Sequence, residues 1–182
     1  ITQKPDVNYE AHVQDKGWQT PVINGETSGT VGERKRIEAI KINVNSNVAG
    51  GVEYQTHIQG IGWQDWVKNG QIAGTTGQSR RVEAIRIRLT GELASKYHIY
   101  YRAHVQNYGW LSWAKDGEYS GSQGYGLRME ALQIKLIEIG KEITDSGIAF
   151  QSPSIKYRAQ LQGTGWQDYR NDGQVAGTIG QS

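Results

Sequence analysis

The stretch from Tyr54 to Leu89, YQTHIQGIGWQDWVKNGQIAGTTGQSRRVEAIRIRL, contains the features that decide the fold of this chain. Alternate side chains differ in character along residues 54–58, and they do so again along residues 83–89. A period of two is typical of strands with one buried face. Asn69-Gly70 is a strong hairpin signal, and a brief strand at 72–75 ends in a glycine-rich turn. The stretch therefore predicts about four short strands and no helix.

This pattern occurs four times, and finding such repeats comes first because they determine the fold. The copies start at Tyr9, Tyr54, Tyr101 and Tyr157. At constant spacing each start is followed by the tryptophan of a Gly-Trp pair: Trp18, Trp63, Trp110 and Trp166. Three glycine positions come next: Gly25, Gly70, Gly117 and Gly173; Gly29, Gly74, Gly121 and Gly177; Gly32, Gly77, Gly124 and Gly180. Three copies go on to an arginine and a glutamate: Arg36/Glu38, Arg81/Glu83 and Arg128/Glu130. The fourth copy reaches Ser182 before these two positions.

Three complete units of about 45 residues predict an all-β domain with pseudo-threefold symmetry. We expect a β-trefoil, with a β-prism as the alternative, because closure removes exposed sheet edges. The predicted repeat domain covers residues 1–145. Residues 146–182 are predicted to form a linker and the start of a fourth, truncated repeat, since Gly147 and Pro153 mark the longest connection.

Composition excludes several classes of protein. The formal net charge of +2 provides no electrostatic basis for binding nucleic acid or an anionic membrane surface. Cysteine is absent, so there are no disulfides, thiol nucleophiles or thiolate metal sites. No apolar run approaches the roughly 18 residues of a membrane span. The chain begins with Ile1 and shows no signal peptide, so we expect it to be a mature or excised piece of a larger protein.

Aromatic residues are the first candidates for a binding site. The Gly-Trp residues suit either a stacking platform for sugar rings or the core of a small repeat, and their constant spacing favours the core. A second aromatic position holds Trp66, Trp113 and Tyr169 but Pro21 in the first copy. Because it varies between copies, it fits a surface contact as well as packing.

Repeated polar residues have competing interpretations. Three histidines, His12, His57 and His104, lie on the strand face opposite the tyrosines, and the fourth copy has Gln160 instead. They suit a metal on a symmetry axis or, more often, hydrogen bonds to a nearby turn. Each Arg/Glu pair suits ligand binding or a half-buried ion pair, and the ion pair is favoured because a buried charge needs a partner. The Gly-Thr-x-Gly turn lacks the lysine and helix of a phosphate loop.

The motifs Tyr-x-Ala-His-Val-Gln-x-x-Gly-Trp, Gly-x-x-x-Gly-Thr-x-Gly and Arg-x-Glu-Ala-Ile-x-Ile-x-Leu together resemble the clostridial hydrophobic W (ChW) repeat. Residues 54–89 are the closest match, and the resemblance covers nearly the whole chain except the connections. The resemblance implies secretion or attachment at the cell surface of a Gram-positive bacterium. It does not imply a particular ligand.

We therefore expect a non-catalytic binding module without a cofactor or a metal, because a catalytic constellation is normally unique whereas every polar feature here is repeated. The expected partner is a polysaccharide or surface glycan, bound through several weak sites. The alternative is a structural or adhesive protein whose repeats contact other proteins or one another, with the incomplete fourth repeat accepting a strand from a partner.

Overall fold

The computed structural model describes residues 4–171 and 175–177 and divides into two compact units, Ile1–Gln151 and Ser152–Ser182. Almost all regular structure in the described residues is strand, as predicted. The one exception is a short 3₁₀ helix, η1 (Gly91–Ser95). Among these residues no helix is long and apolar enough to cross a membrane.

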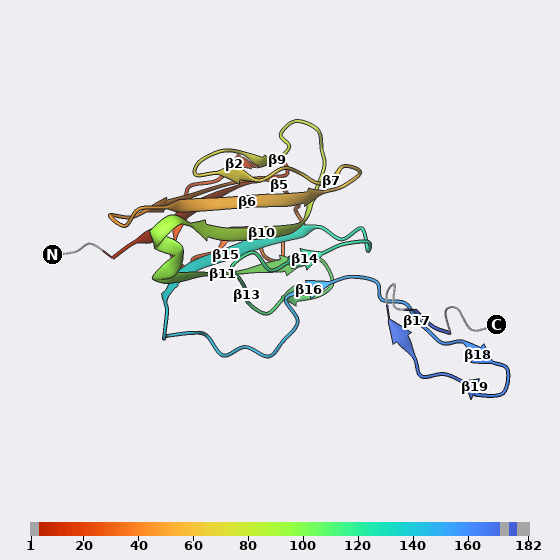
Figure 1. Ribbon diagram of the computed structural model, residues 1–182. Coiled ribbons are helices and arrows are strands. Elements are labelled where there is room, and N and C mark those ends of the chain that lie inside the picture. The colour runs from red at the N-terminus through yellow and green to blue at the C-terminus, as the bar shows by residue number, and fades with distance from the viewer. Residues whose placement is uncertain (1–3, 172–174, 178–182) are drawn as a thin grey trace. The chain divides into compact units, whose positions relative to one another are not determined.

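Each of the first three repeats is built on one long antiparallel strand pair (Figure 1). The pairs are β1 (Asp6–Val13) with β5 (Ile37–Asn45), β6 (Gly51–Ile58) with β10 (Val82–Thr90), and β11 (Tyr97–Val105) with β15 (Met129–Glu138). Buried and less buried residues alternate along β1 without interruption, as a strand with one face on a core requires. The period-two prediction is confirmed for these strands.

Two short strands return over the first long strand of each repeat. They are β2 (Gly17–Trp18) and β3 (Val22–Ile23) on β1, β7 (Gly62–Trp63) and β8 (Val67–Lys68) on β6, and β12 (Gly109–Trp110) and β13 (Ala114–Lys115) on β11. The register places Trp18 opposite His12. Directly opposite residues share a face, so the tryptophan side chain lies on the outward face with the histidine.

The third short strand of each repeat pairs with a neighbouring repeat. Thus β9 (Ala73–Gly74) joins β5, β14 (Ser120–Ser122) joins β10, and β4 (Ser28–Gly29) joins β15, so the exchange is cyclic. Contact is closest at the glycine: a Cβ on Gly74 would lie 2.4 Å from the Glu38 carbonyl oxygen, and its φ is 111°. The first glycine of the Gly-Thr-x-Gly turn is therefore required by backbone contact between repeats.

Tyrosines and isoleucines fill the core. Tyr54 is fully buried, and its hydroxyl donates to the Gln71 carbonyl and accepts from the Ile42 backbone N–H at 3.1 Å. Ile42 belongs to the preceding repeat, and Tyr9 makes the same bond to Ile134 at 3.0 Å, which closes the ring. The tyrosine that starts each repeat thus ties that repeat to its neighbour.

A leucine in place of glutamine changes the strand pairing of the third repeat. In the first two, a glutamine after the Gly-Trp pair accepts from the glycine of the third short strand; Gln64 Oε1 accepts from Gly74 N at 2.8 Å. The third repeat has Leu111 there, and Gly121 N donates to Ala149 O at 3.1 Å instead. Residues Phe150–Gln151 (β16) consequently join β14 as a parallel strand, and the first compact unit extends to Gln151 rather than ending at residue 145.

The three long pairs lie in three separate sheets, and within the described residues they do not close into one barrel. The all-β repeat architecture is confirmed, whereas the pairing assigns neither a β-trefoil nor a β-prism. The second unit repeats the local hairpins: β17 (Lys156–Tyr157) pairs β20 (Arg170–Asn171), and β18 (Gln160–Leu161) pairs β19 (Gly165–Trp166). The predicted turn positions Gly173 and Gly180 lie outside the described residues.

Candidate functional site

A chain of contacts runs across the outward face of each long strand pair. In the second repeat Arg81 Nε lies 2.8 Å from Glu83 Oε1, and His57 Nδ1 lies 3.0 Å from Glu83 Oε2. The His57 ring meets Trp63 edge-on with centroids 5.4 Å apart. Glu83 is only 5% exposed, and a buried carboxylate needs a partner of opposite charge, which Arg81 supplies from the residues just before β10. The predicted Arg–Glu ion pair is therefore present.

Identical contacts recur in the other two complete repeats. His12 lies 3.2 Å from Glu38 and His104 lies 3.1 Å from Glu130, and both stack edge-on against their tryptophans at 5.4 Å. The histidine Nδ1 atoms are buried beside the glutamates and make no well-directed hydrogen bond. Each histidine faces its own glutamate instead of a shared axis. Among the described residues no three His, Asp or Glu side chains are grouped to hold a metal.

Tryptophans occupy the outward face and not the core. Trp18, Trp63 and Trp110 are half-buried, Trp166 is 57% exposed, and none belongs to the buried cluster. The interpretation of these residues as core was wrong, because their register with the histidines sets them on the opposite face from the buried tyrosines. They are available for contact with a ligand.

Cations stack over the Gly-Trp rings of the first, third and fourth repeats, a feature that the sequence patterns did not predict. Lys41 Nζ lies 4.1 Å from the centre of the Trp18 ring. The guanidinium of Arg102 lies 5.0 Å from Trp110 and 4.7 Å from Trp113, so it bridges the two aromatic positions of its repeat. Such contacts are attractive because the faces of aromatic rings are electron-rich.

The second aromatic position extends the stack. Trp66 contacts Arg86 at 5.2 Å and Arg88 at 4.1 Å. Trp113 contacts Lys135 at 4.1 Å, and Tyr169 contacts Arg158 at 4.9 Å. We call this series of His, Trp, cation and second aromatic the aromatic–cation ladder. In the third repeat Arg102 joins both rings, whereas in the second Arg86 lies over Trp66 and over Tyr119 at 4.5 Å, and Tyr119 meets Trp63 edge-on at 5.4 Å. The ladder lacks the second aromatic in the first repeat.

Open hollows lie beside two of the ladders. One, of about 450 Å³, is lined by Trp63, Gln64, Asp65, Val67 and Ile72. Another, of about 240 Å³, is lined by Tyr100, Trp113, Lys115, Glu118, Glu142, Ile143 and Asp145. Each places an aromatic ring next to carboxylate or amide groups, which is the combination that binding sites for polar ring-shaped molecules use.

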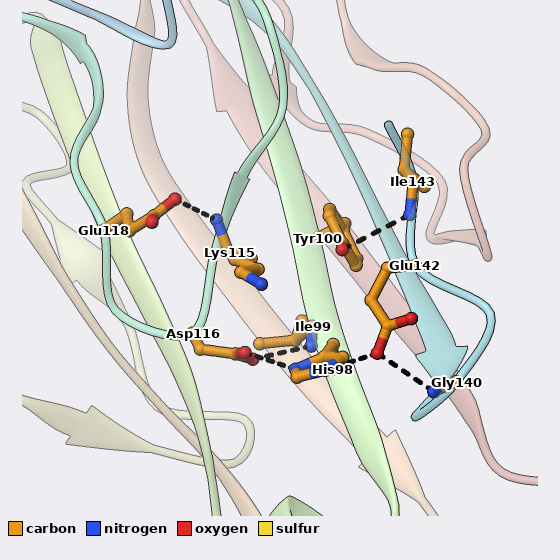
Figure 2. Close-up of polar contacts among 9 residues, drawn as sticks. All are labelled: His98, Ile99, Tyr100, Lys115, Asp116, Glu118, Gly140, Glu142 and Ile143. Carbon is orange, nitrogen blue, oxygen red and sulfur yellow. Dashed lines mark hydrogen bonds and ion pairs between the residues drawn. The ribbon is translucent and has the colours of Figure 1, made fainter. Parts of the chain in front are cut away.

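The third repeat carries an additional polar cluster, which Figure 2 shows. His98 Nδ1 lies 2.5 Å from Asp116, and its Nε2 lies 3.4 Å from Glu142. The Ile143 backbone N–H donates to the Tyr100 hydroxyl at 3.3 Å, which attaches the connection after β15 to β11. A backbone hydrogen bond from Gly140 lowers the pKa of Glu142, so this carboxylate is ionised at neutral pH. His98 was not predicted because it lies outside the repeated positions.

Comparison with known proteins shows one family. No curated protein matches the chain, and no solved structure matches it. The model of the family described as clostridial hydrophobic W matches four segments, residues 12–46, 57–91, 104–138 and 160–182. Three of these begin at the histidine of the ladder and the fourth at Gln160. With all four repeats matched, the chain belongs to the clostridial hydrophobic W family.

Proposed function

We propose that this chain is a non-catalytic module that attaches to carbohydrate outside the cell, in the cell wall or in the surroundings. The observation that carries the proposal is the aromatic–cation ladder, which recurs on the outward faces of the repeats. The C–H face of a sugar ring packs on indole, and Trp63 and Trp113 border the two open hollows. Several such sites on one chain would offset weak binding at each.

The polar groups of the ladder support binding rather than catalysis. Each glutamate is paired with an arginine and contacted by a histidine in the same arrangement, for example Glu130 by Arg128 and His104. A glycosidase needs two carboxyl groups with different environments on either side of one bond. The repeated glutamates have the same environment, so we assign none of them a catalytic role.

For the closure of the repeats we favour a prism-like arrangement over a trefoil. Its support is the cyclic exchange of β4, β9 and β14 between three sheets that stay separate. In such an arrangement the three ladders lie on three outer faces, which suits simultaneous attachment to several polymer strands.

Binding of the full chain to a glycan array and to peptidoglycan tests the proposed function. We expect Trp66→Ala and Trp113→Ala to lose binding while keeping the circular dichroism spectrum of the parent. Tyr125→Ala is the control, because Tyr125 is 44% exposed and belongs to no ladder. Full binding by both tryptophan variants would refute the ladder as the binding site, and absence of binding to every glycan would refute the function.

A second candidate is attachment to proteins or self-association through the fourth repeat. In the second unit Trp166 is 57% and Val175 is 59% exposed, and exposed apolar side chains favour contact with another surface. Sedimentation of the full chain beside Val175→Asp distinguishes this candidate. Self-association through the fourth repeat predicts an oligomer that grows with concentration in the parent chain and is absent in Val175→Asp.

A further inference from the structure

The first repeat differs from the others in three properties of its ladder at once. Its cation is Lys41, whose Nζ lies 3.0 Å from Glu10 and is neutralised by it. Pro21 stands at the second aromatic position. The first ladder therefore has a lysine, a carboxylate partner and no second ring.

In every other repeat the cation is an arginine, a second aromatic ring is present, and no carboxylate pairs with the arginine. The pairs of arginine and second ring are Arg86 with Trp66, Arg102 with Trp113, and Arg158 with Tyr169. Within residues 4–171 and 175–177 none of these arginines forms an ion pair. In each described repeat that has the second ring, an arginine without an ion pair therefore lies over that ring.

We propose that Arg86, Arg102 and Arg158, each stacked on the second aromatic ring of its repeat, bind the carboxylate or phosphodiester groups of an acidic carbohydrate polymer. The inference rests on the proposed attachment to carbohydrate and names the chemical class of that ligand. It assigns three acidic-group sites to the four repeats, with the first repeat left out.

Arg102 makes its hydrogen bond through Nε alone, whereas Arg86 also donates from Nη1 to the Gln55 amide oxygen at 3.2 Å and keeps Nη2 for a ligand. Arg102 Nε donates to Gln133 Oε1 at 2.8 Å, and Arg86 Nε donates to the Gly117 carbonyl at 2.8 Å. These bonds and the ring beneath fix the plane of the guanidinium. A fixed guanidinium presents two parallel N–H groups that match the two oxygens of a carboxylate or a phosphate, which a lysine does not.

Charge around Trp113 strengthens the argument for the third repeat. Lys135 occupies the position of Arg88, which Glu53 neutralises at 2.7 Å in the second repeat. The third repeat has Tyr100 where the second has Glu53, so Lys135 lacks that carboxylate partner.

Partial burial, and then the neighbouring charge of Arg102, lower the pKa of Lys135. Backbone hydrogen bonds from Trp113 and Gly147, and to a smaller extent the charge of Arg102, lower the pKa of the Asp145 carboxylate, which forms no ion pair with either cation. Two cations without an ion pair therefore share one ring, and an anionic group placed between them relieves their repulsion. We expect the third repeat to be the tightest of the three sites.

Titration of the full chain with three polymers tests the inference: polygalacturonate, a glycerol phosphodiester polymer, and neutral dextran. We expect at least one acidic polymer to bind more tightly than dextran, and the better one identifies the acidic group. The double variant Arg86→Gln/Arg102→Gln should weaken that binding by about tenfold or more, since it removes charge-assisted hydrogen bonds. Lys41→Gln is the matched control, and its effect should stay below about twofold because Lys41 is already paired.

The outcomes separate this inference from the proposed function. If the chain binds dextran as tightly as the acidic polymers, or if Lys41→Gln weakens binding as much as the double variant, the acidic-group sites are refuted and carbohydrate attachment stands. If no polymer and no glycan binds, both proposals fall. Thermal unfolding of each variant checks folding, and Arg102→Lys, which keeps the charge over Trp113, replaces the double variant if that unfolds. Full binding by Arg102→Lys would refute the requirement for a guanidinium.

Discussion

Removing one hydroxyl group, by the substitution Tyr54→Phe, tests whether the starting tyrosine joins adjacent repeats. The ring stays in place and fills the same volume, so no cavity is created. The variant loses two hydrogen bonds of the hydroxyl, the one it donates to the Gln71 carbonyl and the one it accepts from the Ile42 N–H. Gln71 is exposed and its carbonyl can turn to water, whereas Ile42 is fully buried.

The expected cost follows from this difference. A buried N–H left without an acceptor costs about 1–3 kcal/mol of unfolding free energy. For a domain of this size each kcal/mol lowers Tm by about 2–4 °C. Urea unfolding monitored by tryptophan fluorescence measures the loss, with Tyr125→Phe as the control, because Tyr125 is exposed. A loss below about 0.5 kcal/mol would refute the hydroxyl as a link between repeats, since surface substitutions cause changes of that size.

The same variant has a signature at alkaline pH. Burial raises the pKa of Tyr54 from 10.0 to about 12, and that of Tyr9 likewise to about 12. A group whose folded pKa lies above its unfolded pKa contributes stability that is fully present below pH 10 and is lost as pH rises from 10 through 12. The stability of Tyr54→Phe should therefore fall less steeply than that of the parent across this range. Equal slopes for the two proteins would contradict the assignment.

Two further substitutions test the contacts between repeats. Gly74→Ala should cost about 2–5 kcal/mol of unfolding free energy, because the new Cβ would meet the Glu38 carbonyl oxygen at a positive φ. Gly77→Ala, also at positive φ but with open space around it, should cost about 1–2 kcal/mol in the same urea assay. Equal costs for the two variants would contradict a contact effect. Leu111→Gln should supply the acceptor that the first two repeats have and release β16 from β14, so we expect faster hydrogen exchange of the Gln123 N–H, which donates to the Gln151 carbonyl; unchanged protection there would show that the leucine does not determine the docking.

Strands were predictable because their alternation has one physical cause, the burial of one face. The position of the tryptophans was not predicted, although the signal was present. Val13 pairs with Gly17 across a tight turn, which fixes Trp18 opposite His12. Constant spacing alone does not distinguish a core residue from an outward one, whereas the length of the turn does, because it sets which face the next strand shares.

The end of the first unit depended on a change too small for a pattern to reveal. Leucine in place of glutamine at residue 111 alters neither the strand period nor the turn signals. Its effect arises because Gly121 N then needs another acceptor, and the Ala149 carbonyl provides one. Compositional signals at Gly147 and Pro153 indicated a linker there, but the requirement to satisfy a backbone N–H extends the unit through β16.

The cation of the ladder shows why comparing repeats position by position was insufficient. It comes from the last long strand in the first two repeats, as Lys41 and Arg86, and from the first long strand in the third, as Arg102. When the second and third repeats are aligned, Gln133 stands at the position of Arg86, and Arg102 stands at the position of Gln55. In sequence these two substitutions look unrelated. In the structure Gln55 faces Arg86 and Arg102 faces Gln133, so the two residues have exchanged places within one cross-strand pair. Because the side chains of such a pair reach the same space, the exchange preserves one cation over the rings. The cross-strand pair, and not the single position, is therefore the unit in which the binding chemistry of these repeats should be compared.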